Sequence, residues 1–411
     1  MTSLQRTAAA VRAGELDPVA LVEQALQRAA DAEQLNAIVH LDVEGALTAA
    51  KRATRGPLAG IPVLVKEIVE VEGLPYRCGS ASMTGVATKD ADVVRRLRAA
   101  GAVIIGLSHS HEFAYGCTGT SNRVGPCRNP RDLARMTGGS SSGAGAAVAA
   151  GVVPLAIGTD TAGSVRMPAA LCGVVGYKPA RDTLPADGVF PLAQSLDTVG
   201  VLTTTVADAV YAMAALSGQP TASEVGTPRL GIATNPEYGD CDAEVAAAWS
   251  HAMAKLETVE VELPDWNTTQ QTGVDMQGPE AVANHLGRST ETYQPDVQQR
   301  LREAAEVPAW RYIQARAAAT DLTNQLSALL QQVDAVLLPT VPIVAPLLDA
   351  DDVRASLMRH VRLPNITGHP AISIPLKTPG LPVGLQLIAR DNQTAGTVAS
   401  WIERALDFER A

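Results

Sequence analysis

Two loops rich in glycine and small hydroxyl residues are the segments of this sequence that could do chemistry. They are Thr137–Gly145 and Gly158–Ser164, and an alanine-rich stretch and an apolar run lie between them. Loops with such small side chains let backbone N–H groups converge on a bound oxygen, as an oxyanion hole requires. If Gly151 turns the chain back, the second loop returns to the first, and we expect Ser140 and Ser164 to meet. The alternative is that both loops only mark turns.

A lysine inside an apolar run is the second candidate. Lys66 lies within Ile61–Val69, and in a strand Leu64 and Ile68 would share its face while Glu67 pointed the other way. Burial among apolar neighbours lowers the pKa of a lysine from its usual value of about 10.4. A lysine that is neutral near pH 7 can take a proton from a hydroxyl. The alternative is a lysine at a strand end that extends its amine to water.

Strand and helix patterns alternate along most of the chain. The predicted strands are Ile61–Val71, Ala102–Leu107, Val152–Gly158, Leu230–Ala233, Val259–Leu263, Val336–Pro339, Ala371–Pro375 and Val383–Ala389. The predicted helices between them are Val93–Ala100, Ser142–Ala150, Val206–Ser217, Ala243–Leu256 and Ala395–Leu406. This alternation predicts an α/β fold on a mixed or mostly parallel sheet. Two further helices are expected before residue 56, and two or three between residues 277 and 332.

Composition narrows the classes of partner. The 411 residues carry a net charge of −10, so there is no basic surface of the kind that binds nucleic acid. The first thirty residues lack the order of a secretory signal, and no apolar run reaches the roughly 18 residues of a membrane span. Five widely spaced cysteines without a C-x-x-C pair favour a reducing compartment. We therefore expect a cytoplasmic protein with neither nucleic acid nor membrane as a partner.

Several segments together resemble the amidase signature family of serine hydrolases. They are Gly138–Pro179, which contains GGSSSGAGAAVAAG and GTDTAGSVRMPAALCGVVGYKP, and the PVLVKEIVEVEGLP run around Lys66. The similarity continues at His111–Ala114, Asp334–Pro346 and Gly380–Arg390, so it spans nearly the whole chain. It implies a single large mixed β-sheet covered by helices on both faces. It also implies one amidase domain over residues 1–411, with N-terminal helices in 1–55, the signature core in 56–220 and a variable helical cap in 277–332.

The resemblance also implies the catalytic residues. Ser164 is expected as the nucleophile, Ser140 as the bridging serine in a cis peptide, and Lys66 as the terminal base. The oxyanion hole is expected from the backbone N–H groups of Thr161, Ala162, Gly163 and Ser164. Three residues depart from the pattern of many members, namely Ser142, Ala144 and Ala162. None of them is a triad side chain, and Ala162 is tolerable unless its backbone requires a positive φ.

This family membership would make the protein an amidohydrolase. The expected reaction converts a linear amide to an acid and ammonia or an amine through a Ser164 acyl-enzyme, with Ser140 and Lys66 as a proton relay. No metal or cofactor is expected. The partner is a small-molecule amide, since the chain is compact for the family, and a homodimer is the family-level expectation. The alternative within the family is a glutaminase-type subunit of a transfer RNA amidotransferase.

A rival nucleophile comes from the same loop. Gly139–Gly143 also fits G-x-S-x-G, so Ser141 could be the nucleophile of an α/β-hydrolase esterase, with His360 or His369 downstream. That motif should directly follow an apolar strand, whereas residues 126–136 are polar and rich in arginine. The sequence therefore favours Ser164 over Ser141.

Other polar residues have two interpretations each. His109 and His111 hint at a metal, but no third histidine lies nearby, and a chance pair is favoured. Arg166 could bind a substrate carboxylate or pair with Asp160 to brace the loop, and bracing is favoured. A third group is expected to pack in the core rather than line a pocket: Trp310, Tyr312 and Arg316.

Overall fold

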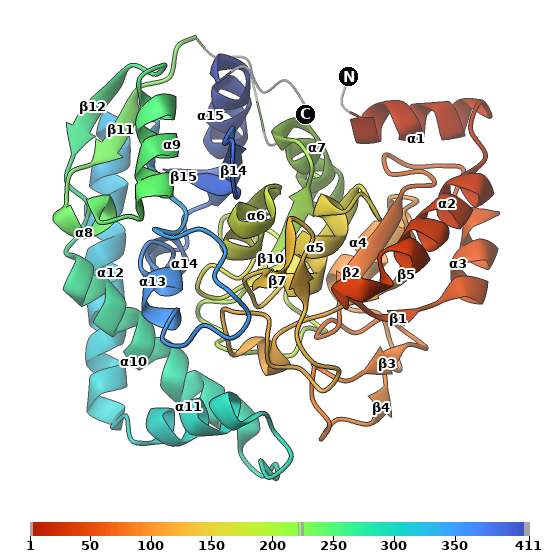
Figure 1. The fold of residues 1–411 in the computed structure, drawn as a ribbon, viewed down its shortest axis with the longest axis horizontal. Coiled ribbons are helices and arrows are strands. Elements are labelled where there is room, and N and C mark those ends of the chain that lie inside the picture. Colours follow the sequence, from red (N-terminus) through yellow and green to blue (C-terminus); the bar gives the residue numbers. More distant parts are fainter. Residues whose placement is uncertain (1–2, 221, 223–225, 407–411) are drawn as a thin grey trace.

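An eleven-stranded sheet forms the centre of the molecule (Figure 1). The computed structural model describes residues 3–220, 222 and 226–406. The strand order is β1-β5-β2-β8-β10-β9-β14-β15-β13-β11-β12. β2 runs parallel to β5 and β8, and β11 to β12 and β13, while the remaining pairs of this sheet are antiparallel. The prediction of a single mixed sheet with helices is therefore confirmed. The alternative prediction of a mostly parallel sheet is wrong.

All eight predicted strands are present, two of them (β11 and β15) with the predicted ends and the other six with shifted ends. In sheet order the strands are β1 (Ile38–Leu41), β5 (Val103–Ser108), β2 (Pro62–Lys66), β8 (Leu155–Asp160), β10 (Thr198–Thr203), β9 (Val175–Lys178), β14 (Ala371–Leu376), β15 (Val383–Ala389), β13 (Ala335–Pro339), β11 (Leu230–Ala233) and β12 (Thr258–Val261). Two small sheets pair β3 (Pro75–Tyr76) with β4 (Gly85–Val86) and β6 (Arg128–Asn129) with β7 (Asp132–Met136). β1, β9 and β10 were not predicted, and β2 ends at Lys66 rather than Val71.

The helices come from most of the predicted segments. They are α1 (Ser3–Ala13), α2 (Pro18–Asp31), α3 (Val43–Ala50), α4 (Asp92–Ala99), α5 (Ser142–Ala149), α6 (Arg166–Cys172), α7 (Val206–Ser217), α8 (Pro236–Gly239), α9 (Ala243–Met253), α10 (Trp266–His285), α11 (Pro295–Ala305), α12 (Ala309–Gln332), α13 (Arg354–Met358), α14 (Leu363–Thr367) and α15 (Asn392–Ala405). Two short 3₁₀ turns are Glu33–Leu35 and Glu112–Ala114. Figure 1 shows α10, α11 and α12 together on one side of the molecule, opposite α2 and α3.

The long helix α12 corrects one prediction. Trp310 is 58% exposed and Arg316 is also exposed. The prediction that these two residues pack in the core is therefore wrong. Tyr312 is partly buried, and its hydroxyl donates to Glu280 Oε1 at 3.0 Å. The buried face of this helix consists instead of Ala315, Ala319, Leu322, Leu326 and Leu330.

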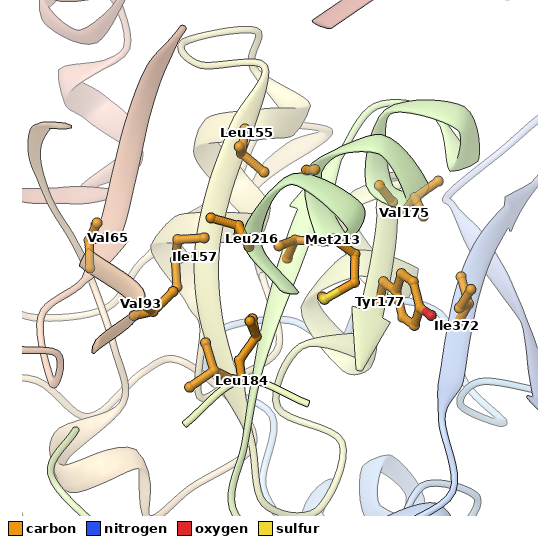
Figure 2. Close-up of a cluster of buried hydrophobic side chains, with 14 of the residues drawn as sticks. Val65, Val93, Leu155, Ile157, Val175, Tyr177, Leu184, Met213, Leu216 and Ile372 are labelled. Atoms are coloured by element: carbon orange, nitrogen blue, oxygen red, sulfur yellow. The ribbon is translucent and has the colours of Figure 1, made fainter. Parts of the chain in front are cut away.

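The central strands are covered on both faces. Val65 and Ile157 point into one hydrophobic cluster, which also contains Val93 of α4 and Met213 of α7 (Figure 2). Leu64 and Ala156 belong to a second cluster with residues of α2, α3 and α5. This alternation follows from the two-residue period of a strand. Because both faces are packed, β2 and β8 form a rigid support for whatever lies at their ends.

The parallel pairing of β2 and β8 positions the chemistry-bearing residues. Val65 pairs with Ile157, so the carboxyl ends of the two strands lie at the same edge of the sheet. Lys66 ends β2, and Thr159 and Asp160 end β8. The loop that contains Ser164 follows β8 directly, so it begins beside Lys66.

Candidate active site

Lys66 lies buried at the sheet edge with two hydroxyl partners. Its Nζ donates to Ser140 Oγ at 2.7 Å and to Thr159 Oγ1 at 2.8 Å. Burial lowers the pKa of this amine to about 7, and the negative charges of Asp160, Asp197 and Glu67 only partly offset that effect. Within the described residues Lys66 has no ion-pair partner, as the strand pattern predicted. The amine can therefore be neutral at neutral pH while it contacts a serine hydroxyl.

The two small-residue loops meet, as predicted. The Gly139–Ser140 peptide is cis, and the N–H of Ser141 donates to the carbonyl oxygen of Ser164 at 3.1 Å. The Ser141 hydroxyl is fully buried, where it donates to the Thr159 carbonyl and accepts from the Thr159 N–H. This hydroxyl holds the loop against β8 and does not line the pocket at Ser164, which argues against the alternative with Ser141 as nucleophile.

Ser164 lies on the turn between β8 and α6. It is 5% exposed and lines a narrow pocket with a volume of about 20 Å³. In the part of the chain that the structure describes, no hydrogen bond to the Ser164 hydroxyl is found, so it is available to a ligand in this pocket. The loops bring Ser164 next to Ser140 through the backbone contact at Ser141, while the Lys66 amine contacts Ser140 directly.

The turn before Ser164 carries the expected N–H donors, with one exception. The N–H of Gly163 donates to Asp160 Oδ1 at 2.7 Å, so it is engaged in the turn and departs from the predicted oxyanion hole. Among the described residues no partner is found for the N–H groups of Thr161, Ala162 and Ser164. Gly163 has a φ of +104°, whereas Ala162 is not among the residues with positive φ. The Ala162 methyl group is therefore compatible with this turn.

Asp160 and Arg166 form a buried pair that braces the turn. The guanidinium of Arg166 donates to both Asp160 oxygens at 3.0 and 2.9 Å, and also to the Val361 carbonyl and the Asn365 side chain. Burial raises the pKa of Asp160, but Arg166, with smaller contributions from Lys178 and Asn365, more than offsets this effect and holds that pKa well below its usual range. Arg166 is fully buried with all of these partners. It braces the loop, as favoured, and the alternative role as a substrate ligand is wrong.

Several functional residues were not predicted. Thr159 stands in the quoted loop, yet nothing indicated that it contacts the lysine. The pocket at Ser164 is also lined by Tyr115, Cys117, Gln277 and Arg354, which come from segments far apart in sequence. A larger pocket of about 480 Å³ lies around Trp266, and none of the predicted catalytic residues lines it.

The two histidines have structural partners instead of a shared ligand. His109 Nδ1 and Ser142 Oγ form a hydrogen bond at 2.7 Å, which gives the unusual Ser142 a role in the loop. His111 Nε2 and Asp296 Oδ2 form one at 3.0 Å. A search of the described residues finds no group of three His, Cys, Asp or Glu side chains placed to hold a metal ion. In the same residues, no helix has both the length and the apolar character needed to cross a bilayer.

Comparison with known proteins gives the family. The Amidase family model matches residues 20–397. The chain is 35% identical over 423 aligned residues to 2-amino-5-chloromuconic acid deaminase of Comamonas testosteroni, covering 94% of this chain and 92% of that protein. It is 32% identical over 454 residues to a glutamyl-tRNA(Gln) amidotransferase subunit of Salinispora arenicola (strain CNS-205), covering 94% and 91%.

A solved structure described as an amidase superposes with a TM-score of 0.93 at 32% identity. The match covers 98% of this chain and all of that one. The span matched by the family model contains Lys66, Ser140 and Ser164, which lie at one sheet edge. The chain belongs to the amidase family, and it is an amidohydrolase that acts on the C–N bond of an amide.

Proposed function

We propose that this enzyme hydrolyses a small linear carboxylic amide through an acyl-enzyme on Ser164, with Ser140 and Lys66 as the proton relay. The observation that carries the proposal is the buried hydrogen bond from Lys66 Nζ to Ser140 Oγ at 2.7 Å, beside the pocket that Ser164 lines. A serine hydroxyl is a weak nucleophile until a base removes its proton. A lysine with a pKa of about 7 is such a base at neutral pH.

Acylation would proceed by two coupled proton transfers. Neutral Lys66 takes the proton of the Ser140 hydroxyl, and Ser140 takes the proton of Ser164. The Ser164 oxygen attacks the amide carbonyl carbon, and the N–H groups of Thr161 and Ala162 stabilise the oxyanion that forms. The C–N bond then breaks, and the nitrogen leaves as ammonia or an amine with the proton returned from the relay.

Deacylation would reuse the same relay. Water donates a proton towards Ser140 and Lys66 while its oxygen attacks the acyl carbon. The bond to the Ser164 oxygen breaks, Ser164 regains a proton, and the acid leaves. Thr159 supports both steps because its hydroxyl accepts a second hydrogen bond from Lys66 Nζ and fixes the amine beside Ser140.

The size of the substrate is argued from the pocket. A volume of about 20 Å³ is close to the space that one water molecule needs, so the pocket beside Ser164 is narrow and favours a slim substrate. One relative is named for a small amino acid derivative, 2-amino-5-chloromuconic acid. The second candidate is a glutaminase-type subunit, supported by the similarity to the Salinispora amidotransferase. Release of ammonia from small amides by the isolated chain would favour the first function.

Reaction with a fluorophosphonate, read by intact mass, tests the proposal. Ser164→Ala should remove the adduct and lower kcat by at least about 10⁴-fold without changing the fold. Lys66→Met should abolish labelling at neutral pH. Lys178→Met is the matched control, since Lys178 is also fully buried with its pKa lowered to about 7, but its Nζ donates to the Pro179 carbonyl. Labelling that persists in Ser164→Ala would refute the proposal.

A further inference from the structure

We propose that the pocket at Ser164 contains a carboxylate-binding subsite formed by Arg362 and Arg354, so that the substrates are small amides that carry a carboxylate near the amide. The inference rests on the proposed function, because it names the substrate class of the same site. It concerns the side of the pocket formed by α10, α13 and the residue before α14.

Arg362 is a buried cation without an anionic partner. Its side chain is 4% exposed, and its Nε makes no hydrogen bond within the described structure. Its one hydrogen bond there is a long one, from Nη1 to Gln277 Oε1 at 3.5 Å. Gln277 itself lines the pocket with Ser164, so the guanidinium lies directly behind a pocket wall. A buried guanidinium normally pairs with a carboxylate, because desolvation of an unpaired charge is costly.

Arg354 adds a second positive charge at the same pocket. It lines the pocket together with Ser164 and Gln277, and it is exposed at the first residue of α13. Burial and, to a smaller extent, the like charge of Arg354 together lower the pKa of Arg362 to about 10. Burial raises the pKa of Tyr115, and the charges of Arg354 and Arg362 act against that effect. The two guanidinium groups therefore act on one small volume.

Two partly or fully buried carboxylates of α10 and α11 are already paired with other arginines, and Glu303 of α11 accepts a hydrogen bond from Gln299. Asp275 accepts from Arg311 at 2.6 and 3.1 Å, and Asp296 accepts from Arg300 at 2.6 Å. No salt bridge to Arg354 or Arg362 is found among residues 3–220, 222 and 226–406. An anion brought by the substrate is what this pair lacks, and a carboxylate matches the planar fork of a guanidinium.

The position of the pair limits the substrate further. Ser164 and Arg354 line the same narrow pocket, so the amide carbon and the carboxylate must be separated by only a few bonds. The backbone of α10 makes room for this group, since a Cβ on Gly273 would lie 3.0 Å from Arg362 Cδ and 3.1 Å from its Nη1. Monoamides of short dicarboxylic acids have this chemistry.

Matched substrates test the subsite directly. Succinamic acid is compared with butyramide, and malonamic acid with propionamide, so that a methyl group replaces the carboxylate. The carboxylate preference is the ratio of kcat/KM for the acid to kcat/KM for its neutral counterpart. We expect a preference of at least about 100-fold in the wild type, the size of effect expected from charged hydrogen bonds to a buried group.

Three variants assign the preference to residues. Arg362→Met should lower the carboxylate preference by at least about 30-fold, mainly through KM, while Arg362→Lys should retain part of it. Arg354→Met should lower it by about tenfold, since water screens this exposed charge. Arg359→Met is the matched control, because Arg359 lies on the same segment but pairs with Asp240, and its preference should equal that of the wild type.

A measurement on the wild type covers the case in which Arg362→Met does not fold. Succinate should slow fluorophosphonate labelling of Ser164 at least about tenfold more than butyramide does at equal concentration. The subsite would be overturned if Ser164 is labelled but hydrolysis shows no carboxylate preference and succinate does not slow the labelling. The proposed function would then still stand. Absence of both labelling and hydrolysis in the wild type would instead overturn the proposed function, and the subsite with it.

Discussion

Two buried arginines, Arg166 and Arg362, lie close to the pocket at Ser164 and differ in their partners. Arg166 of α6 donates to both oxygens of Asp160 and to Asn365, and it is fully buried. Arg362 is nearly as buried but makes only a long hydrogen bond to Gln277 within the described residues. The two guanidinium groups are therefore almost equally buried, but Arg166 has an anionic partner and Arg362 has none within the described residues. The difference separates a guanidinium that holds the fold together from one that is available to a ligand.

The largest expected effect is on stability at the satisfied arginine. Arg166→Met leaves the Asp160 carboxylate buried without its partner, which should lower the free energy of unfolding by about 3–5 kcal/mol. Urea denaturation followed by circular dichroism measures it. The double variant with Asp160→Asn should lose less than the sum of the two single losses, because the two groups form one unit. Additive losses would contradict the bracing role.

The pH profile separates the proposed catalytic base, Lys66, from the proposed binding group, Arg362. Lys66 must be neutral to act as a base, so kcat/KM should fall about tenfold per pH unit below a pKa of about 7 and be level above it. Burial lowers the pKa of Arg362 only to about 10, so this group stays charged. The carboxylate preference should therefore remain constant between pH 6 and pH 9. A preference that followed the same pKa as kcat/KM would contradict this division.

A smaller effect is expected from crowding the unsatisfied arginine. Gly273→Ala places a methyl group against the Arg362 side chain, so the guanidinium must shift by a few tenths of an ångström. We expect the carboxylate preference to fall by about threefold to tenfold, because charged hydrogen bonds depend on geometry. Gly278→Ala on the same helix meets Ala304 instead and serves as the control. An unchanged preference in Gly273→Ala would place the binding group elsewhere.

The smallest effect is on stability at the unsatisfied arginine. Arg362→Met removes a buried charge and leaves no carboxylate behind, so the free energy of unfolding should change by no more than about 1 kcal/mol. Urea denaturation of both variants, Arg362→Met and Arg166→Met, compares their losses in the free energy of unfolding directly. A loss as large as that of Arg166→Met would show that Arg362 has a structural partner and would remove the basis of the comparison.

Much of the scaffold could be predicted because local patterns determine it. The apolar run that ends at Lys66 and the two loops around Ser140 and Ser164 are local features, and burial and strand pairing followed from them. β9 and β10 were missed because glycines interrupt their apolar runs, as in Thr198–Thr203. β2 stops at Lys66 although the apolar run continues, because the chain turns there, with the N–H of Val69 donating to the Lys66 carbonyl, and then runs beside residues 188–190.

The pocket wall could not be predicted in the same way. Tyr115, Gln277, Arg354 and Arg362 come from three distant segments, and only the tertiary fold brings them to Ser164. A sequence shows which arginines exist but not which carboxylates they find. For that reason Arg166, two residues after the nucleophile, was weighed as a substrate ligand, whereas Arg362 was not considered.

The ion pair of Asp160 and Arg166 has a consequence for substrate length. Asp160 accepts from the backbone beside Ser164, and Arg166 and Asn365 tie it to the segment that carries Arg362. This buried ion pair thus fixes the spacing between Ser164, the proposed nucleophile, and Arg362, the proposed carboxylate-binding residue. A fixed spacing selects substrates by length. In a homologous series of ω-amide acids, kcat/KM should therefore show one sharp optimum in chain length rather than a gradual trend.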